Sequence, residues 1–533
     1  MSEMKDRSVY PGITEPLSLE KPKEHDIKLT DELQKTLVQY GLYDSKERAK
    51  QREYVLKSLD KMTKKFVQIV YERQGFSKQE AIQAGGKVLT YGSYRLGANA
   101  ADADIDTLCV FPKYVSRKDF FTIMLSLLRS NEQIKDITPV TDSYVPVIKF
   151  KYNDIPIDFV CARLTVDQVP EDIDLSDPKI LWGLDEYSIR SLNGARVADD
   201  ILRLVPNIET FRTALRCIKL WATRKAIYSN ILGFLGGVAW AILVARVCQL
   251  YPHASASTVV YHFFQILVHW SWPSPVMLKA VEDGPPLAAT RPWNPKLNPT
   301  DRSHRMPIIT PSYPSMCSTH NVIPSTQRII MGEIKQAAEI VQKIRTGSAT
   351  WARLFQSHNF FEIYMQYLQI TVVADNYNLQ LKWAGLVEAR LRQLVMKLES
   401  IQSIALVHPF IDGFSESHVC QTMADIAAGR HKIGYNNQVS VKKIYSKTFY
   451  IGLYLRLPGK LNMEIDISDP IEEFKNMLKM WPKYDYRRMG IKIDCLSKLD
   501  LPMSKLNIVG KRTLKVTTGE DRTRCLVGNI FVV

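Results

Sequence analysis

Two patterns that would assign the chemistry of this chain at once are missing from its sequence. No stretch matches GxxxxGK[ST] or GxGxxG, so neither a P-loop nor a Rossmann nucleotide site is expected. The eight cysteines include no closely spaced pair. Their spacing argues against a zinc ligand set and a disulfide framework, and it favours a reducing, intracellular setting.

Long apolar runs are also scarce. The uncharged run ILGFLGGVAWAILVA, which starts at Ile231, ends at Arg246. It is shorter than the roughly 18 residues that a membrane helix requires. The N-terminal stretch up to Glu24 is polar and lacks the apolar core of a signal peptide. We therefore expect a buried helix after Ile231, no membrane contact and no secretion.

The composition is typical of a soluble multidomain protein. The 533 residues, of which 46% are hydrophobic and 10% aromatic, are enough for about three domains with apolar cores. Lysine and arginine number 70 against 55 aspartates and glutamates, which leaves a formal charge of +15. This balance favours a polyanionic partner, the alternative being a merely basic surface.

Hydrophobic periodicity predicts an α/β module in the first part of the chain. Amphipathic helices are expected over 30–82, followed by strands in KVLTYGS and DIDTLCVF and a helix in DFFTIMLSLLR. The stretch VPVIKFKYNDIPIDFVCARL predicts two more strands with a turn at Asn153-Asp154. The pattern is then helical over 185–270, and a proline-rich stretch over 273–324 predicts an extended connection.

A third pattern begins near residue 350. Its strands and helices follow the order β-α-β-β-α-β, which fits a ferredoxin-like sheet. No stretch matches the aromatic signature KGFGFVxF, so base stacking on the face of this sheet is not expected. The pairs Lys442-Lys443, Arg487-Arg488 and Lys511-Arg512 are candidates for phosphate contacts.

The stretch YGSYRLGANAADADIDTLCVF places three aspartates at alternate positions, Asp102, Asp104 and Asp106. A strand would set Asp104 and Asp106 on one face about 7 Å apart. Carboxylates without a nearby His or Cys select magnesium or manganese over zinc. Two-metal phosphoryl transfer needs a further carboxylate, and IPIDFVCARL supplies Asp158 between apolar residues that would bury it. The Gly92-Ser93 turn upstream can present backbone N–H groups to a triphosphate.

Longer motifs resemble a known family. The residues YGSYRLG, ADIDTLCVFP and IDFVCARL are similar to the polymerase-β-type nucleotidyltransferase superfamily. The stretches DEYSIRSLNGARVADDILRLVPN, IKLWATRKAIYSNILGFLGGVAWAILVARVCQLYP, SWPSPVMLK and HRMPIITPSYPSMCSTHNV resemble the eukaryotic nuclear poly(A) polymerases. The likeness runs from about residue 10 to beyond 500.

The resemblance implies an α+β multidomain fold. The expected parts are an N-terminal segment packing on the middle domain (1–50), a catalytic nucleotidyltransferase palm (51–170), a helical middle domain (171–348), a C-terminal ferredoxin-like, RRM-like RNA-binding domain (349–515) and a tail (516–533). The family usually carries a Thr and a Gly where this chain reads Ala100-Ala101-Asp102-Ala103, so a minor nucleotide contact is in doubt.

The resemblance also implies roles for single residues. Asp104, Asp106 and Asp158 would be the catalytic metal ligands for two Mg²⁺ or Mn²⁺ ions. The expected nucleotide-binding residues are Tyr91, Gly92, Ser93, Asn193, Lys219, Tyr228, Asn230, Gly237 and Val238. Of these, Gly92 and Ser93 would hold the triphosphate.

The expected function is template-independent addition of AMP from ATP to the 3′ end of pre-mRNA. The chain would be a monomeric, nuclear catalytic subunit that works with subunits of a cleavage and polyadenylation complex. Two alternatives stay open. One is another terminal transferase, uridylyl-transferring or CCA-adding, and the other is an RNA-binding scaffold without catalysis.

Overall fold

The computed structural model describes residues 10–287, 290–420, 442–456, 464–501 and 524–526. Its internal contacts divide the chain into two compact units. The first comprises residues 1–221, 236–320 and 334–355, and the second comprises 222–235, 321–333 and 356–533. Among the described residues, no helix is long and apolar enough to cross a membrane.

A five-stranded sheet forms the core of the N-terminal part of the first unit, in the order β1-β2-β5-β4-β3. The strands are β1 (Lys87–Thr90), β2 (Ile105–Phe111), β3 (Ile134–Val140), β4 (Val147–Tyr152) and β5 (Ile155–Arg163). Strands β2 and β5 are parallel, and the other neighbouring pairs are antiparallel. The sheet therefore brings together β2, which carries Asp106, and β5, which carries Asp158.

Most of these strands were predicted, and the β4–β5 turn lies at the expected Asn153 and Asp154, both with positive φ. Two details differ from the prediction. β2 begins at Ile105, so Asp104 directly precedes the strand. The sequence also gave no sign of β3, because this edge strand is mostly exposed and irregular near Asp136.

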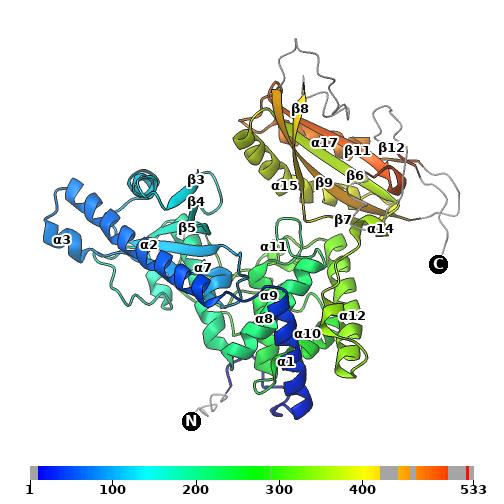
Figure 1. Ribbon diagram of the computed structural model, residues 1–533, viewed down its shortest axis with the longest axis horizontal. Helices are drawn as coiled ribbons and strands as arrows, with labels where there is room; N and C mark the ends of the chain where they lie inside the picture. The colour runs from blue at the N-terminus through cyan, green and yellow to red at the C-terminus, as the bar shows by residue number, and fades with distance from the viewer. Residues whose placement is uncertain (1–9, 288–289, 421–441, 457–463, 502–523, 527–533) are drawn as a thin grey trace. The chain divides into compact units, whose positions relative to one another are not determined.

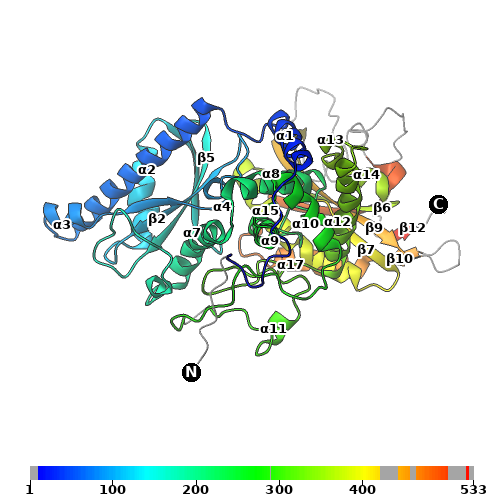
Figure 2. The same cartoon turned by 90° about the horizontal axis from the view of Figure 1, so that it is seen from below.

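Helices cover both faces of this sheet (Figure 2). On one face lie α2 (Lys46–Arg73), α3 (Lys78–Gln83) and the helical stretch formed by α5 (Arg117–Asp119), η1 (Phe120–Met124) and α6 (Leu125–Arg129). On the other face lies α7 (Glu186–Leu204). The short helix α4 (Gly92–Arg95) contacts β2, α7 and α9.

The rest of the first unit is largely helical, as predicted. It includes α1 (Glu24–Gln39), α9 (Gly237–Leu250), α10 (Ala256–Val268), α11 (Pro299–Arg302), α13 (Trp351–Leu354) and most of α8 (Ile208–Arg224), and α12 (Pro324–Arg345) ends in it. α1 packs against α10 and α13. α9 is buried from Ala239 to Leu250, which confirms a buried helix after Ile231.

The second unit contains the predicted ferredoxin-like sheet (Figure 1). Its elements are α14 (Phe360–Ile363), β6 (Gln366–Ala374), α15 (Tyr377–Glu399), β7 (Ile404–Pro409), β8 (Phe414–Cys420), β9 (Lys442–Leu455), α17 (Ser468–Lys479), β11 (Met489–Ser497) and η3 (Lys498–Asp500), with a small pair β10 (Glu464–Asp466) and β12 (Arg524–Leu526). The order β11-β6-β9-β7 is the 4-1-3-2 order of that fold, and β8 adds a pairing to β9. α15 packs on β6, β7 and β9 and contacts α17.

One expectation about cysteine is wrong, because Cys495 in β11 is disulfide-bonded. Cys109, Cys161, Cys217, Cys248 and Cys317 are free and buried. The pair Lys511-Arg512 and residues 516–523 and 527–533 of the predicted tail 516–533 lie outside the described residues.

Candidate active site

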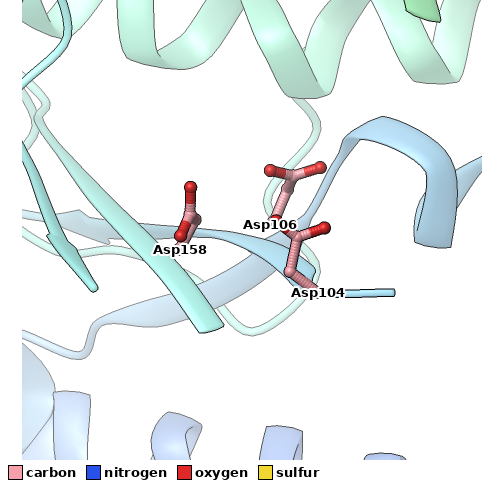
Figure 3. A group of neighbouring side chains, drawn as sticks. All are labelled: Asp104, Asp106 and Asp158. Atoms are coloured by element: carbon pink, nitrogen blue, oxygen red, sulfur yellow. The ribbon is translucent and has the colours of Figure 1, made fainter. Parts of the chain in front are cut away.

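Three carboxylates meet at one end of the parallel strands β2 and β5. One ligand oxygen from each of Asp104, Asp106 and Asp158 lies within 4.8 Å of the others. Asp106 and Asp158 are directly paired across the two strands. Figure 3 shows the three side chains projecting to the same side of the strand ends. Asp102 is exposed in the preceding turn and is not part of this group.

The crowding of negative charge perturbs Asp106 in particular. Burial raises the pKa of Asp106 to about 7, and the charges of Asp104 and Asp158 act in the same direction. Lys149 and Lys219 lower it and do not fully offset the repulsion. A site that holds three carboxylates against this cost fits a bound cation, which would favour their charged forms.

Gly92 lies against Asp106. Its φ is +62°, and a Cβ atom built there would be 2.0 Å from Oδ2 of Asp106. The backbone N–H of Tyr91 donates to the carbonyl of Asp106 at 3.1 Å. The Gly92-Ser93 turn is therefore fixed directly beside the carboxylates.

Lys149 is a neighbour that the sequence reading missed. Its Nζ lies 2.5 Å from Oδ2 of Asp158. The Asp158 side chain is 22% exposed, so the flanking apolar residues do not bury it as expected. A signal existed, because a two-residue turn at Asn153-Asp154 pairs Lys149 with Asp158 across the hairpin.

Arg52 is a second missed residue, fully buried on α2. Its Nη2 donates to the carbonyls of Ala101 at 3.1 Å and Ala103 at 2.8 Å. Its Nε lies 3.2 Å from the carboxylate of Asp44. Arg52 thus holds the backbone that leads into Asp104. A charged residue on the apolar stripe of an amphipathic helix was the available signal.

Lys219 on α8 reaches the same region. Its Nζ donates to the carbonyl of Ala98, 3.0 Å away, in the loop after α4. Burial lowers the pKa of Lys219 to about 8, although the charges of Asp106 and Asp104 raise it. Lys219 therefore provides a positive charge near the carboxylates at neutral pH.

Tyr91 follows β1 and packs against α7, the helix that carries Asn193. A Cβ atom on Gly194 would be 2.9 Å from the Tyr91 ring, so the ring packs on α7 beside Asn193. Burial raises the pKa of Tyr91, with Asp106 adding to the shift. The side-chain Oδ1 of Asn193 is buried and has no hydrogen-bond partner in the described part of the chain. An unpartnered buried acceptor fits a ligand hydroxyl or N–H.

The remaining predicted nucleotide contacts divide between the units. Gly237 and Val238 begin α9 in the first unit, and Val238 is 36% exposed. Tyr228 and Asn230 belong to the second unit, so the structure does not join them to the aspartates in one unit. The side-chain Oδ1 of Asn230 is also buried without a partner among the described residues.

Three family profiles match consecutive parts of this chain. They describe a poly(A) polymerase nucleotidyltransferase domain at residues 12–205, a poly(A) polymerase central domain at 210–357 and a poly(A) polymerase predicted RNA binding domain at 359–511. The chain belongs to the poly(A) polymerase family. This membership confirms the resemblance, the fold class and the polynucleotide adenylyltransferase class of enzyme expected from the sequence.

Curated relatives support this membership over most of the chain. The poly(A) polymerase pla1 of Schizosaccharomyces pombe is 44% identical over 525 residues, covering 92% of each chain. The nuclear poly(A) polymerase 1 of Arabidopsis thaliana is 45% identical over 494 residues, covering 92% of this chain and 66% of the relative. The poly(A) polymerase PAPa of Candida albicans is 41% identical over 515 residues, with 92% of each covered.

A solved structure of Cid1 in complex with its short product ApU aligns with 62% of this chain and 99% of its own. Its sequence identity is 12% and the TM-score 0.43.

At the level of the poly(A) polymerase family, the domains and the aspartate group imply the use of a nucleotide, RNA and a divalent metal.

Proposed function

We propose that this chain adds AMP from ATP to the 3′ end of pre-mRNA without a template. The observation that carries the proposal is the meeting of Asp104, Asp106 and Asp158 within 4.8 Å beside the Gly92 turn. Catalytic chemistry at this point would need a 3′ hydroxyl, a nucleoside triphosphate and divalent cations held by the aspartates, and no covalent enzyme intermediate.

The three aspartates would hold two divalent cations, magnesium or manganese. When bound, such ions stabilise the charge that develops on the attacking and leaving oxygens of an in-line displacement. Asp158 would help to remove the proton of the 3′ hydroxyl, which then attacks the α-phosphate while pyrophosphate leaves. Lys149 would have to release Asp158 for this step, since its Nζ now lies 2.5 Å from that carboxylate.

The nucleotide would be held by residues of the first unit near the aspartates, and the contacts predicted for Tyr228 and Asn230 belong to the second unit. Gly92 and Ser93 would contact the triphosphate, with Lys219 and Tyr228 contacting phosphates. Asn193 and Asn230, each with a buried unpartnered Oδ1 among the described residues, are suited to ribose or base contacts. Gly237 and Val238 would face the adenine, with Tyr91 packing beside the triphosphate turn.

The wider setting follows from the family. We propose the domain division given above, with the C-terminal domain contacting RNA through basic side chains such as Lys443 and Arg487. We also propose that the chain acts as a monomeric catalytic subunit in the nucleus, beside subunits of a cleavage and polyadenylation complex. Relatives named as nuclear poly(A) polymerases support this location.

The test is extension of an unstructured RNA primer by the purified protein with each of the four nucleoside triphosphates separately. Long products with ATP alone support the proposal. Products with UTP alone would favour a uridylyltransferase, and addition limited to a CCA end would favour a CCA-adding enzyme. Binding of the primer without extension by any nucleotide would favour the scaffold.

A further inference from the structure

A second pocket lies in the first unit, at the opposite end of β2 and β5 from the aspartates. It has a volume of about 200 Å³ and is lined by Phe111, Arg117, Cys161, Arg163 and Asp185. Phe111 and Arg163 end the two strands side by side, five residues beyond the Asp106–Asp158 pair in each strand (111 − 106 and 163 − 158). At about 3.3 Å per residue, the pocket is roughly 17 Å from the aspartates. It is a separate site.

Asp185, the one carboxylate that lines this pocket, already has hydrogen-bond partners on both of its oxygens. Asp185 caps α7 by accepting hydrogen bonds from the backbone N–H groups of Tyr187 and Ser188, both at 3.1 Å. It also accepts from the Ser188 hydroxyl at 2.7 Å and pairs with Nη2 of Arg117. Although burial raises the pKa of Asp185, its hydrogen bonds from Ser188 and Arg117 bring that pKa below the usual value. Asp185 therefore stays ionised, and Arg117 balances its charge.

Arg163, an exposed residue, adds a second positive charge to the lining of the pocket. Its backbone N–H donates to the Ser188 hydroxyl at 3.1 Å, which fixes the position of this residue against α7. In the part of the chain that the structure describes, its guanidinium has no hydrogen-bond or ion-pair partner. An exposed arginine that lines a pocket without an acceptor has its planar set of N–H donors available to a ligand.

The floor of the pocket is neutral and apolar. Phe111 and Cys161 are 0% and 3% exposed. Burial raises the pKa of the Cys161 thiol to about 12, although Arg117 acts against the shift. The thiol therefore carries no charge at neutral pH. Two arginines, one aspartate and a neutral floor leave the pocket with a net positive charge.

We propose that this pocket binds a small phosphate-class oxyanion, inorganic phosphate or pyrophosphate, between Arg117 and Arg163. A guanidinium presents parallel N–H donors that match the oxygens of such an anion. A tetrahedral oxyanion has oxygens on several sides, so it can accept from both arginines at once. A planar carboxylate already occupies Arg117 in the form of Asp185. The free anion is favoured over an RNA phosphate because the pocket, at about 200 Å³, is small.

The test is calorimetric titration of the full chain with inorganic phosphate, and separately with pyrophosphate, in the presence of a chelator that removes divalent metals. We expect saturable binding to the wild type. Arg163→Gln should weaken it by at least about tenfold, since a charge-assisted pair is lost. Arg163→Lys keeps the positive charge but lacks the planar guanidinium with its parallel N–H donors. Its affinity for phosphate should therefore lie between those of the wild type and Arg163→Gln. Thermal unfolding should be unchanged in both variants because the guanidinium has no partner among the described residues.

Two controls locate the effect. Arg129→Gln removes an exposed arginine of the same unit that does not line the pocket, and it should bind phosphate as the wild type does. Lys219→Gln removes the buried cation near the aspartates and should leave the Arg163-dependent binding in place. A labelled RNA primer should bind Arg163→Gln and the wild type equally.

Three results would overturn the proposal. They are the absence of saturable phosphate binding to the wild type, wild-type binding by Arg163→Gln, or loss of binding in Lys219→Gln alone. A loss of primer affinity in Arg163→Gln as large as its loss of phosphate affinity would assign the pocket to RNA and would also overturn it.

Discussion

Oδ2 of Asp106 lies 2.0 Å from the point that a Cβ atom would occupy on Gly92. Residue 92 also has a φ of +62°, a conformation that side chains with a Cβ atom rarely adopt. Glycine is therefore required at this position for two independent reasons. The turn proposed to hold the triphosphate and the carboxylate proposed to hold the cations are fitted to each other.

Gly92→Ala should abolish extension. The new methyl group must displace the carboxylate of Asp106. Moving a catalytic group by about 1 Å costs on the order of a hundredfold or more in rate. Single-turnover primer extension measures the loss. The matched control is Gly75→Ala, which has a φ of +90° but nothing within 4 Å of its Cβ position. That variant should lose about 1 kcal/mol of stability and keep its activity; equal losses of activity in the two variants would contradict the steric account.

Lys149→Gln should tighten metal binding at pH 8.5. The wild-type ammonium lies 2.5 Å from Asp158 and competes with a cation for that carboxylate. Removing one positive charge at this distance is worth about 1.7 kcal/mol through solvent, or on the order of tenfold in affinity. Titration of Mn²⁺ by electron paramagnetic resonance, without nucleotide or RNA, measures the change. Weaker Mn²⁺ binding in the variant would show that Lys149 organises the site instead of competing for it.

The apparent kcat/KM for ATP should fall as the pH rises through about 8. Burial lowers the pKa of Lys219 to about 8, so the side chain is charged below this pH and neutral above it. The neutral form can no longer attract the triphosphate, and kcat/KM reports ionisations of the free enzyme. A pH profile of the wild type beside Lys219→Gln checks this. Lys219→Gln should have a lower kcat/KM that does not fall further above about pH 8. If kcat/KM of the variant still falls above about pH 8, another group causes the decrease and the assignment to Lys219 is wrong.

The Asp102→Asn and Asp104→Asn variants should differ sharply in primer-extension activity. Asp102 is exposed and lies outside the group of three, so a charge acting through solvent should change activity by no more than about tenfold, or about 1.4 kcal/mol. Asp104→Asn removes a proposed ligand and should lose almost all activity. The check is to measure the extension activity of both variants side by side as a function of magnesium concentration. A dead Asp102 variant beside an active Asp106 variant would place the metal site one step out of register.

Local patterns were enough to predict much of this architecture. Alternation and turn residues placed β4, β5 and the turn at Asn153-Asp154, and the same turn fixes the register that pairs Lys149 with Asp158. The order β-α-β-β-α-β predicted the sheet of the second unit. These features depend on contacts that are close in sequence or on a repeated period.

Other features depend on burial and on distant partners. β3 was missed because an exposed edge strand with a bulge after Lys135 has no alternation to detect. Arg52 was missed because its acceptors, the carbonyls of Ala101 and Ala103, lie some 50 residues away along the chain. The unpartnered Oδ1 of Asn193 is likewise a property of packing between α7 and its surroundings. Sequence periodicity reports which face is buried, and not which polar atoms are left without partners.

The most direct test of the account is single-turnover extension by Asp106→Ala, measured together with its affinity for the RNA primer. Asp106 is one of the three grouped carboxylates proposed to hold the cations, and its loss would remove several kcal/mol of transition-state stabilisation, a loss of about a thousandfold or more in rate. We expect extension to disappear while primer affinity stays within about threefold of the wild type. A variant that still extends the primer within tenfold of the wild-type rate would contradict the assignment of this site.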